Sequence, residues 1–458
     1  MTLLDLRLRV TSPELLALPW SEPLADWDPT AVELRDLPVG PSRHLVRFVE
    51  ADGRLWALKD LPRRLAVREY DVLRDLERRQ LAAVRVAGVV MQPGEDAAIL
   101  VTHYLERSWQ YRRLLMRVPG SMRVHRARLF DAMALLLVDL HRNGVYWGDC
   151  SLANTLFMRD GQSIQAWMVD AETAELHPAL SDGQRADDLE RTVENVAGGL
   201  LDVAARRQEP AGSSADLFDE ARSVGERYAQ LWELLFDAPL VDLGDHDRIA
   251  GRLHKLQEMG FELDEIRFEP AGEPTDQLRM RVSVAGRSFH ADQFRALTGR
   301  DVGEGQAAIL LNDLRAYHAA LQRRSTREVT EDEAARRWLD DVFRPGVEVA
   351  HRAVGQVGDP TQAYCDLLEV RWLLSEEAGA DVGDDPALRA MAEHQAPGEA
   401  AANLAVVDMA TQELPAVPPG TATAGETSGG GGHPSAQQPE AHPSDRDDQP
   451  VRDHTEDQ

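Results

Sequence analysis

The side chains of Asp149, Asn154, Asp170, Lys59 and Glu69 have types and spacings that could carry chemistry. Asp149 and Asn154 share the loop "GDCSLAN", and Asp170 ends the strand-forming run "IQAWMVD". Upstream, Lys59 closes the run "LWALK", and Glu69 follows in a segment with helical spacing. Phosphoryl transfer from ATP needs a lysine on the phosphates, a carboxylate that orients the lysine, oxygen ligands for Mg²⁺, and a carboxylate beside the attacking hydroxyl. The chain presents these parts in one order.

Each of these residues has one expected role. Asp149 is the candidate that accepts the hydroxyl proton or orients the nucleophile. Asn154 and Asp170 are the candidate ligands of Mg²⁺, which prefers hard oxygen atoms and keeps several waters. Lys59 is expected to hold the phosphates of ATP, with Glu69 as its ion-pair partner. The D-x-x-x-x-N spacing alone is typical of a polar turn whose side chains cap the local backbone, so only the combination favours the chemistry.

The elements that must position these residues can be read from turn signals and periodicity. Asp52-Gly53 is a strong hairpin signal between two strand-forming runs. Gly144 follows a helical pattern as a C-terminal cap does. Strands are predicted at 43–50, 54–60, 84–91, 97–105, 145–147, 154–158 and 164–170, and helices at 65–80 and 123–143. This order predicts a small sheet with one helix, followed by a mostly helical half around the loop of Asp149.

A separate α+β unit is predicted in the second half of the chain. Its expected helices cover 216–237, 245–259, 303–323, 330–355 and 361–377, with a strand pair at 262–270 and 278–286. From about residue 395 the chain is rich in Ala, Pro, Gly, Ser and Glu, with almost no large apolar residue. Such a segment cannot bury enough surface to offset its ordering entropy, so 395–458 is predicted to be a disordered tail.

Residues 38 to 205 resemble the protein-kinase-like superfamily, and among its branches the lipopolysaccharide (Kdo/WaaP) kinases and aminoglycoside-phosphotransferase-like enzymes. "LWALK" occupies the position of the kinase V-A-I-K motif. "YWGDCSLAN" has the Gly-Asp form in place of His-Arg-Asp, and "VDAE" replaces Asp-Phe-Gly. The resemblance implies a two-lobed α+β fold with ATP and Mg²⁺ as cofactors. Its small lobe would span about 38–106 and its large lobe about 107–210, after an N-terminal extension, 1–37.

The resemblance also implies further site residues. Asp188, in "RADDLERTVENV", would be the buried aspartate that braces the catalytic loop. Gly40, Thr102 and Tyr104 join Lys59 and Glu69 as the expected nucleotide contacts. Gly40 is the only glycine of "LPVGPSRHLVRF", which departs from the glycine-rich loop that normally covers the phosphates.

Residues 216 to 390 resemble a bacterial domain of unknown function, number 4032, through "FHADQFRALTGRDVGEGQAAILLNDLRAYH" and "DPTQAYCDLLEVRWLLSEEAG". This domain is typically found behind a kinase-like region and carries no function with it. We expect it to span 216–392 as a mostly helical α+β domain, and it leaves a protein partner open.

Composition limits the function classes. The formal charge of −28 disfavours nucleic acid and anionic membranes as partners, because phosphates would be repelled. The two cysteines, Cys150 and Cys365, are too few and too far apart for a disulfide framework or a thiolate cage, which suits a reducing compartment. No apolar run approaches the roughly 20 residues of a membrane span. We therefore expect a soluble, cytoplasmic protein.

The expected function is transfer of the γ-phosphoryl group of ATP to a hydroxyl of a small-molecule or sugar-like acceptor. Only residues 171–187 separate Asp170 from Asp188, which leaves little room for a peptide groove. The alternative is a pseudokinase, a nucleotide-binding regulatory or scaffold protein without turnover. All of the lysine, base and metal positions are filled, which favours activity, whereas the single glycine at Gly40 favours the alternative.

Some residues allow a second interpretation. Lys59 and Glu69 are only ten positions apart, so Glu77, two helical turns further on, is the alternative ion-pair partner. Cys150 could be a thiol nucleophile, but no histidine is arranged to activate it, and a packing role is favoured. The segment "GRDVGEGQ", 299–306, could cradle an anion at a helix start, although a glycine-rich turn between helices is the simpler interpretation.

Overall fold

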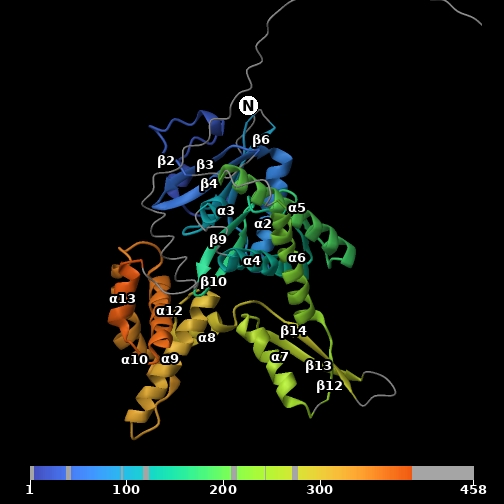
Figure 1. Ribbon diagram of the computed structural model, residues 1–458. Coiled ribbons are helices and arrows are strands. Elements are labelled where there is room, and N and C mark those ends of the chain that lie inside the picture. Colours follow the sequence, from blue (N-terminus) through green and yellow to red (C-terminus); the bar gives the residue numbers. More distant parts are fainter. Residues whose placement is uncertain are drawn as a thin grey trace, which may run out of the picture. The chain divides into compact units, whose positions relative to one another are not determined.

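The computed structural model describes residues 5–37, 43–93, 96–116, 123–207, 214–242, 244–270 and 277–394. Gly40 and the tail predicted from residue 395 lie outside these ranges. Within the described residues the chain alternates strands and helices, first in a lobe built on one large sheet and then in mostly helical parts (Figure 1). The predicted α+β class is confirmed.

The small lobe is a six-stranded sheet in which each pair of neighbours is antiparallel. Its strands lie in the order β1-β5-β6-β4-β3-β2. They are β1 (Asp5–Leu8), β2 (Leu34–Arg35), β3 (Val46–Ala51), β4 (Arg54–Pro62), β5 (Val86–Met91) and β6 (Ala97–His103). The predicted turn joins β3 to β4, with φ of 50° at Asp52 and 68° at Gly53. Two consecutive positive φ values are what a two-residue hairpin turn needs, and Asp-Gly adopts them readily.

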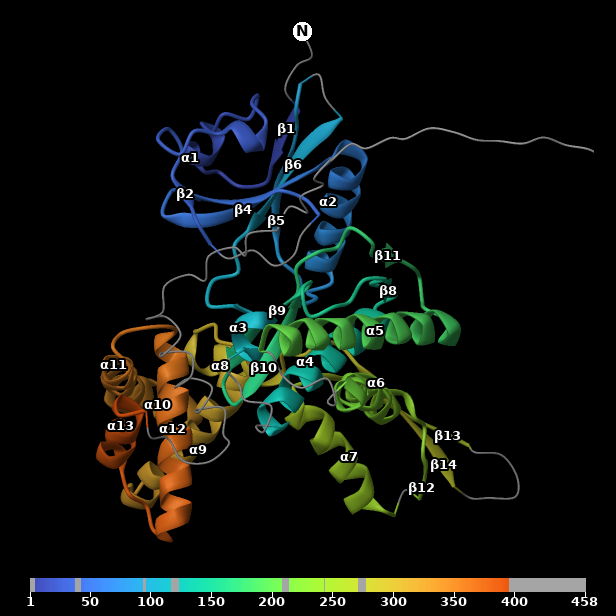
Figure 2. The same ribbon diagram turned by 45° about the horizontal axis from the view of Figure 1, so that its top comes forward.

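Both faces of this sheet are covered. In β6, Ala98 and Leu100 pack on the face of helix α2 (Arg63–Arg78), while Ile99 and Val101 pack on the opposite face. That opposite face is covered by the N-terminal segment, which includes helix α1 (Pro13–Leu16), the 3₁₀ turn Leu24–Asp26 and the buried Trp20 and Trp27. Figure 2 shows α1 and α2 on opposite sides of the sheet. The span predicted as an extension thus supplies two strands, β1 and β2, and half of the cover.

The large lobe surrounds the loop of Asp149 with helices and short sheets. Its helices are α3 (Tyr111–Leu115), α4 (Arg123–Arg142), α5 (Asp182–Arg207) and α6 (Ser214–Phe236). Its strands are β7 (Trp109–Gln110), β8 (Val145–Tyr146), β9 (Thr155–Asp160), β10 (Ser163–Met168) and β11 (Glu175–Leu176), paired as β10-β9-β7 and β11-β8. Helix α6 packs on α4 and α5 within the same hydrophobic core, although residue 216 was expected to open a separate domain.

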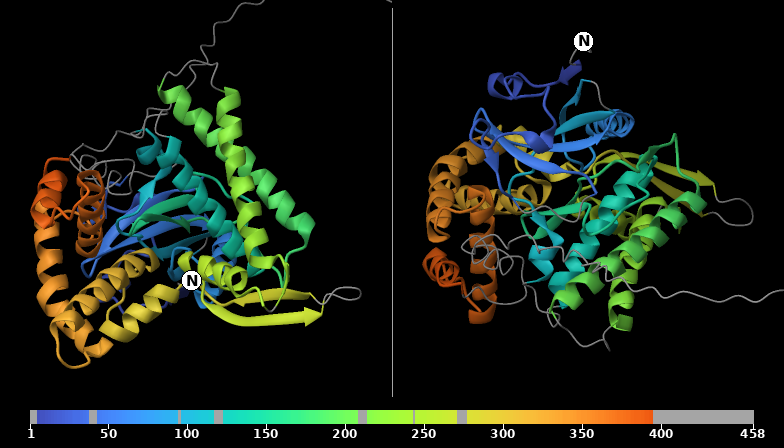
Figure 3. Two further views of the ribbon diagram at one scale, coloured as in Figure 1. Left: turned by 60° about the horizontal axis from the view of Figure 1, so that its bottom comes forward. Right: turned by 90° about the horizontal axis from the view of Figure 1, so that it is seen from above.

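The remaining elements form a small sheet and a second helical core. The sheet has the order β12-β14-β13, from β12 (Leu240–Val241), β13 (Leu263–Pro270) and β14 (Leu278–Val284), next to helix α7 (His246–Glu258). The core is built by α8 (Phe289–Thr298), α9 (Glu304–Arg324), α10 (Glu331–Trp338), α11 (Arg344–Ala353), α12 (Pro360–Ala378) and α13 (Asp384–Ala392). In both views of Figure 3 these helices, coloured gold to red, form one group.

One predicted helix of this core differs in detail from the expectation. The helix expected over 330–355 is present, but a π-helical segment, Leu339–Phe343, joins α10 to α11. Pro345, at the start of α11, has no N–H to donate to the preceding turn. A single wide turn beside this proline keeps the chain helical on both sides.

The second core is tied to the tip of the β9–β10 hairpin by buried polar contacts. Both carboxylate oxygens of Asp160 accept hydrogen bonds of 2.9 Å from the first amides of α9, those of Gly305 and Gln306. A side chain on Gly305 would collide with the backbone of Asp160, because an added Cβ would lie 2.0 Å from its carbonyl oxygen. The "GRDVGEGQ" segment therefore binds the carboxyl group of the chain's own Asp160 at the start of α9.

A second set of contacts holds the same hairpin to α12. The guanidinium of Arg159 donates to both carboxylate oxygens of Asp366, at 2.8 and 2.5 Å, and both side chains are 5 % exposed. The side chain of Gln362 exchanges two hydrogen bonds with the backbone of Gly161, at 2.8 and 3.0 Å. We call Asp160, Arg159 and Gly161 with their partners the hairpin clasp.

Candidate active site

Lys59 lies at the centre of the small-lobe sheet, where its strand β4 is paired on both sides. Its backbone is opposite Val46 in β3 and Leu100 in β6. The ammonium Nζ lies 3.0 Å from Glu69 Oε2 and 2.9 Å from Asp170 Oδ2, and the side chain is 14 % exposed. The structure thus brings together three predicted site residues that the sequence separates by up to 111 positions.

The short connection between Lys59 and Glu69 has a simple structural basis. Strand β4 runs to Pro62, and α2 begins at Arg63 with no intervening loop. Glu69 then lies in the second turn of α2 and faces the sheet, buried to 1 % exposure. The alternative partner, Glu77, lies near the far end of α2 and forms an ion pair with Arg9 instead.

Burial and neighbouring charges decide the ionisation of this cluster. Burial, together with the negative charge of Asp170, raises the pKa of Glu69 to about 7, against the opposing effect of Lys59. For Lys59, burial disfavours the charged form, but the charges of Glu69 and Asp170 outweigh it and raise the pKa of the ammonium. The Lys59 ammonium thus faces three carboxylates, because Glu172 Oε2 also lies 3.8 Å from Nζ.

This raised pKa predicts a pH-dependent contribution of Glu69 to stability. The folded protein holds the Glu69 proton more tightly than an unfolded chain, so this stabilisation is complete below pH 4.5 and is lost as the pH rises through about 7. Between about pH 5 and pH 8, the free energy of unfolding of the wild type should fall by roughly 2–3 kcal/mol relative to that of Glu69→Gln, whose side chain cannot ionise. Urea unfolding of both proteins across this range measures the difference, and parallel stability curves would contradict the prediction.

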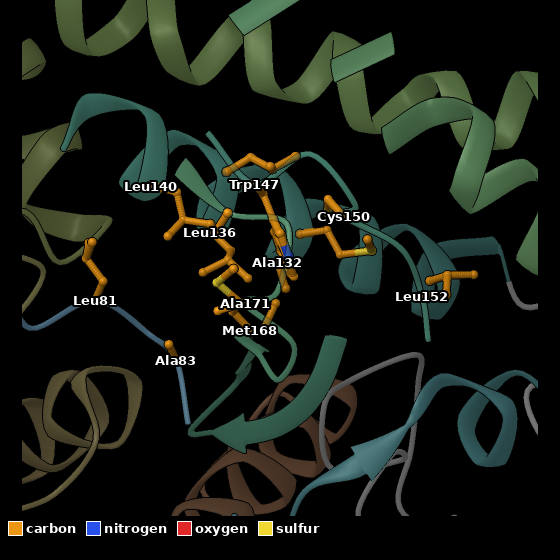
Figure 4. Close-up of a cluster of buried hydrophobic side chains, with 14 of the residues drawn as sticks. Leu81, Ala83, Ala132, Leu136, Leu140, Trp147, Cys150, Leu152, Met168 and Ala171 are labelled. Carbon is orange, nitrogen blue, oxygen red and sulfur yellow. The ribbon is translucent and has the colours of Figure 1, made fainter. Parts of the chain in front are cut away.

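The loop of Asp149 is anchored by apolar side chains on both sides of the aspartate. Trp147, Cys150 and Leu152 are at most 1 % exposed and belong to the main core. Figure 4 shows them among residues of α4, including Leu136 and Leu140. Because its neighbours are buried, the half-buried Asp149 is held at a fixed place on the surface of this core.

The two residues of the D-x-x-x-x-N spacing are bonded to each other. Asn154 Nδ2 donates to Asp149 Oδ2 and to the backbone carbonyl of Asp149, both at 3.0 Å. This fixes the Asn154 amide so that its nitrogen faces Asp149. In the part of the chain that the structure describes, the amide oxygen of Asn154 accepts no hydrogen bond, and it is therefore available as a hard oxygen ligand.

Opposing effects act on the pKa of the Asp149 carboxyl group. Burial, with the nearby negative charge of Asp170, raises its pKa, whereas the hydrogen bonds from Asn154 and Asn195 lower it. Asp170 itself is held at both oxygens: Oδ1 accepts from the amide of Glu172 at 3.0 Å, and Oδ2 binds Lys59. The negative charge of Asp170 thus acts on Asp149, and a cation close to either carboxylate is favoured electrostatically.

Asp188 has the geometry that a bracing carboxylate needs. It is fully buried, and its two oxygens accept the backbone amides of Trp147 at 2.7 Å and Gly148 at 2.9 Å. His141 Nε2 lies 3.0 Å from Asp188 Oδ2, and its Nδ1 lies 2.8 Å from the hydroxyl of Tyr228. Asp188 of α5 therefore holds the backbone before Asp149 in place, and it is in turn contacted by His141 of α4, which contacts Tyr228 of α6.

Asn195 is a site residue that the sequence reasoning missed. Its Nδ2 donates to Asp149 Oδ1 at 3.1 Å and to the carbonyl of Cys150 at 3.2 Å. With Asn154 on the other oxygen, each oxygen of Asp149 accepts one amide. The signal was present in the sequence: Asp188, Thr192 and Asn195 lie at i, i+4 and i+7 on one face of α5.

Asn195→Ala is expected to change the chemistry of Asp149 more than the binding of nucleotide. Loss of the amide donor removes two contacts to the loop, so we expect kcat to fall about tenfold with little change in the KM for ATP. Since the lost hydrogen bond lowered the pKa of Asp149, the acid limb of the kcat profile should move to higher pH. Asn195→Ser, which keeps a donor, should move it less. An unchanged pH profile for Asn195→Ala would contradict this role.

The remaining predicted contacts are placed as follows. Thr102 lies on β6 opposite Ala57 of β4, two residues from the position that pairs with Lys59. Tyr104 follows the end of β6 and packs edge to face on Phe48, with ring centroids 5.5 Å apart. Cys150 is fully buried, and burial raises the pKa of its thiol well above the ordinary value. A thiolate nucleophile at Cys150 is therefore disfavoured.

The described residues contain neither a membrane-spanning helix nor a cluster of metal-binding side chains. None of the helices there is long and apolar enough to cross a bilayer. No group of three or more His, Cys, Asp or Glu side chains in that part of the chain is arranged to hold a metal ion.

Comparisons with known proteins agree with this geometry. Residues 52–202, which carry Lys59, Glu69, Asp149, Asn154 and Asp170, match the model of the Lipopolysaccharide kinase (Kdo/WaaP) family. Residues 230–395 match the model of a domain of unknown function, DUF4032. The chain thus matches a kinase family model over its first segment and the DUF4032 model over the segment behind it.

A search of curated proteins finds no match. Among solved structures, the chain is similar to "WaaP in complex with acyl carrier protein", at 18 % identity and a TM-score of 0.30, over 50 % of this chain and 90 % of the other.

Proposed function

We propose that this protein is an ATP-dependent phosphotransferase that transfers the γ-phosphoryl group to a hydroxyl of a small-molecule or sugar-like acceptor. The observation that carries the proposal is the Lys59 ammonium, which lies within 3.0 Å of both Glu69 and Asp170. Beside it, Asp149 and Asn154 are bonded to each other in a loop that the core holds in place. These residue types, in these positions, support the proposal because phosphoryl transfer uses a lysine, a base and oxygen ligands for Mg²⁺.

The chain's own groups have distinct tasks in this proposal. Lys59, oriented by Glu69, neutralises phosphate charge when ATP binds. Asp149 accepts the proton of the acceptor hydroxyl as its oxygen attacks. The free amide oxygen of Asn154 and the carboxylate of Asp170 fit the oxygen-ligand preference of Mg²⁺, and these two residues would hold it. The metal would supply positive charge that neutralises the phosphate oxygens.

A small acceptor is supported by the segment that follows Asp170. Within residues 171–187, the short strand β11 pairs with β8, and α5 begins at Asp182. The backbone carbonyl of Ala174 accepts from Arg68 of α2. A segment this short, and tied down at these points, leaves little backbone to build a platform for a peptide. We place the reaction in the cytoplasm, where ATP is available and where two buried free thiols persist.

Nucleotide binding is the first test. ATP should raise the melting temperature markedly more with Mg²⁺ than without it, because the proposed metal ligands are one amide and one carboxylate. By linkage, ligand at about 100 times its dissociation constant adds roughly 2.7 kcal/mol to stability. A differential scan with ATP, with and without Mg²⁺, measures this. No shift at millimolar Mg-ATP would refute the nucleotide-binding proposal.

A second experiment separates the enzyme from its alternative, a pseudokinase or nucleotide-binding regulatory protein. Both bind Mg-ATP, but only the enzyme consumes it when a suitable acceptor is present. ATP consumption against fractions of a metabolite extract, with Asp149→Asn as the matched control, distinguishes them. Consumption that equals the Asp149→Asn background in every fraction would favour the regulatory protein.

A further inference from the structure

A cavity of about 290 Å³ lies beside the hairpin clasp, away from the phosphotransfer cluster. Three parts of the chain line it. The first is the connection after β6 with the start of β7, through Glu106 and Trp109. The others are the hairpin, through Met158 and Asp160, and the C-terminal helices with the loop before α12, through Val357 and Asp366. Asp160, the last residue of β9, is six positions after Asn154, about 20 Å along an extended strand. The cavity is therefore a site distinct from the one that Asp149 serves.

The walls of the cavity combine apolar surface with a floor of fixed polar groups. Trp109, Met158, Val354 and Val357 supply the apolar part. The polar floor is the hairpin clasp, in which Arg159 is bound to Asp366 and Gln362 is bound to Gly161. Because these groups hold one another, the floor is formed before any ligand arrives. A concave apolar site with a few fixed polar groups is typical of small-molecule binding.

The charge of the lining decides which ligand fits. The cavity has four carboxylates against two guanidiniums, a formal net charge of −2. Both guanidiniums are engaged, Arg159 with Asp366 and Arg107 with Asp359 at 3.4 Å. An anion would have to compete with these carboxylates. In the ranges that the structure describes, Glu106 at the rim is paired with no cation.

We propose that this cavity binds a small organic cation, with an ammonium or guanidinium group toward Glu106 and an apolar part against Trp109, Met158 and Val357. A cation beside the Trp109 ring also gains from the ring's negative face. This claim concerns binding alone and does not depend on the proposed phosphotransferase activity. A bound cation would contact three elements at once: the connection between the lobes, the hairpin that leads from Asn154 toward Asp170, and the C-terminal helices.

The test is calorimetric titration of the full chain with 2-phenylethylamine, tryptamine and agmatine, which are amines or guanidines. The uncharged 2-phenylethanol and the anion phenylacetate serve as matched probes. We expect saturable binding of at least one cation, about tenfold or more tighter than binding of the alcohol, and no binding of phenylacetate. No saturable binding of any cation at millimolar concentration, or equal binding of amine and alcohol, would overturn the proposal.

Two variants locate the site. Glu106→Gln should weaken the best cation about threefold or more, as expected for loss of a partly exposed ion pair. Val357→Trp should fill the cavity and remove binding of both cation and alcohol. Glu190→Gln, which alters an exposed carboxylate on α5, should leave the affinity unchanged. Wild-type affinity in Val357→Trp would place the cation elsewhere and refute this site.

Discussion

Asp149→Asn should remove most phosphoryl transfer while Mg-ATP binding stays near that of the wild type. The variant keeps the size of the side chain and one of its two acceptor oxygens, but it cannot accept the acceptor's proton. Loss of a positioned general base typically costs about 10²- to 10⁴-fold in rate. The rate is measured as Asp149-dependent transfer of labelled phosphate, and binding as the Mg-ATP shift in melting temperature. The affinity should hold because Asp149 is not among the proposed contacts of the nucleotide.

Asp170→Asn is the informative comparison. It removes a carboxylate that lies 2.9 Å from Lys59 and is a proposed Mg²⁺ ligand, so both binding and turnover should fall. Glu190→Gln, on the exposed side of α5, serves as the neutral control. Equal turnover in the wild type and Asp149→Asn would show that Asp149 is not the base. Loss of Mg-ATP binding in Asp149→Asn would show that its role is not confined to the chemical step.

Asp366→Leu should destabilise the protein by about 3–5 kcal/mol, because it leaves the Arg159 guanidinium buried without its carboxylate. Both partners are 5 % exposed, so water cannot replace the lost hydrogen bonds. The effect should reach the active site as well, since Arg159 lies on the strand that begins directly after Asn154. Urea unfolding measures the stability, and the melting-temperature shift with Mg-ATP measures the effect on the site.

The double variant Arg159→Met with Asp366→Leu distinguishes two contributions to stability. One is the destabilisation caused by a buried guanidinium that has lost Asp366, and the other is the net stabilisation by the ion pair. Replacing both partners by apolar side chains of similar size should recover most of the stability. The control is Glu348→Ala, whose partner Arg352 is 59 % exposed and whose loss should cost less than about 1 kcal/mol. A cost as small as this for Asp366→Leu would contradict the description of the clasp.

The local pattern of the sequence determined the elements that carry the phosphotransfer residues. The Asp-Gly turn, the strand-forming runs and the helical spacing each depend on residues that are close in the chain. For the same reason Gly144 could be predicted as a helix end: its φ of 74° is a property of one residue. The order lysine, glutamate, Asp149, Asn154, Asp170 was sufficient to propose the chemistry and to predict that these residues meet.

The short N-terminal elements could not be predicted in this way. Strand β1 has four residues and helix α1 has four, too few to show a period. Their place is decided by the hydrophobic face of the sheet, where Trp20 and Trp27 are buried against β4, β5 and β6. Burial of this kind depends on what the rest of the chain leaves uncovered, so it follows only from the tertiary structure.

The contacts that hold the site in place were likewise decided by the tertiary structure alone. Asn195 is 46 positions from Asp149, and Asp366 is 207 positions from Arg159. No local pattern marks such pairs, because the hydrogen bond exists only when two separate elements pack. The sequence determined which groups could do the chemistry. The packing of α5 on the loop, and of α9 and α12 on the β9–β10 hairpin, decided which further residues fix those groups, because a buried polar group must find its partner wherever the fold provides one.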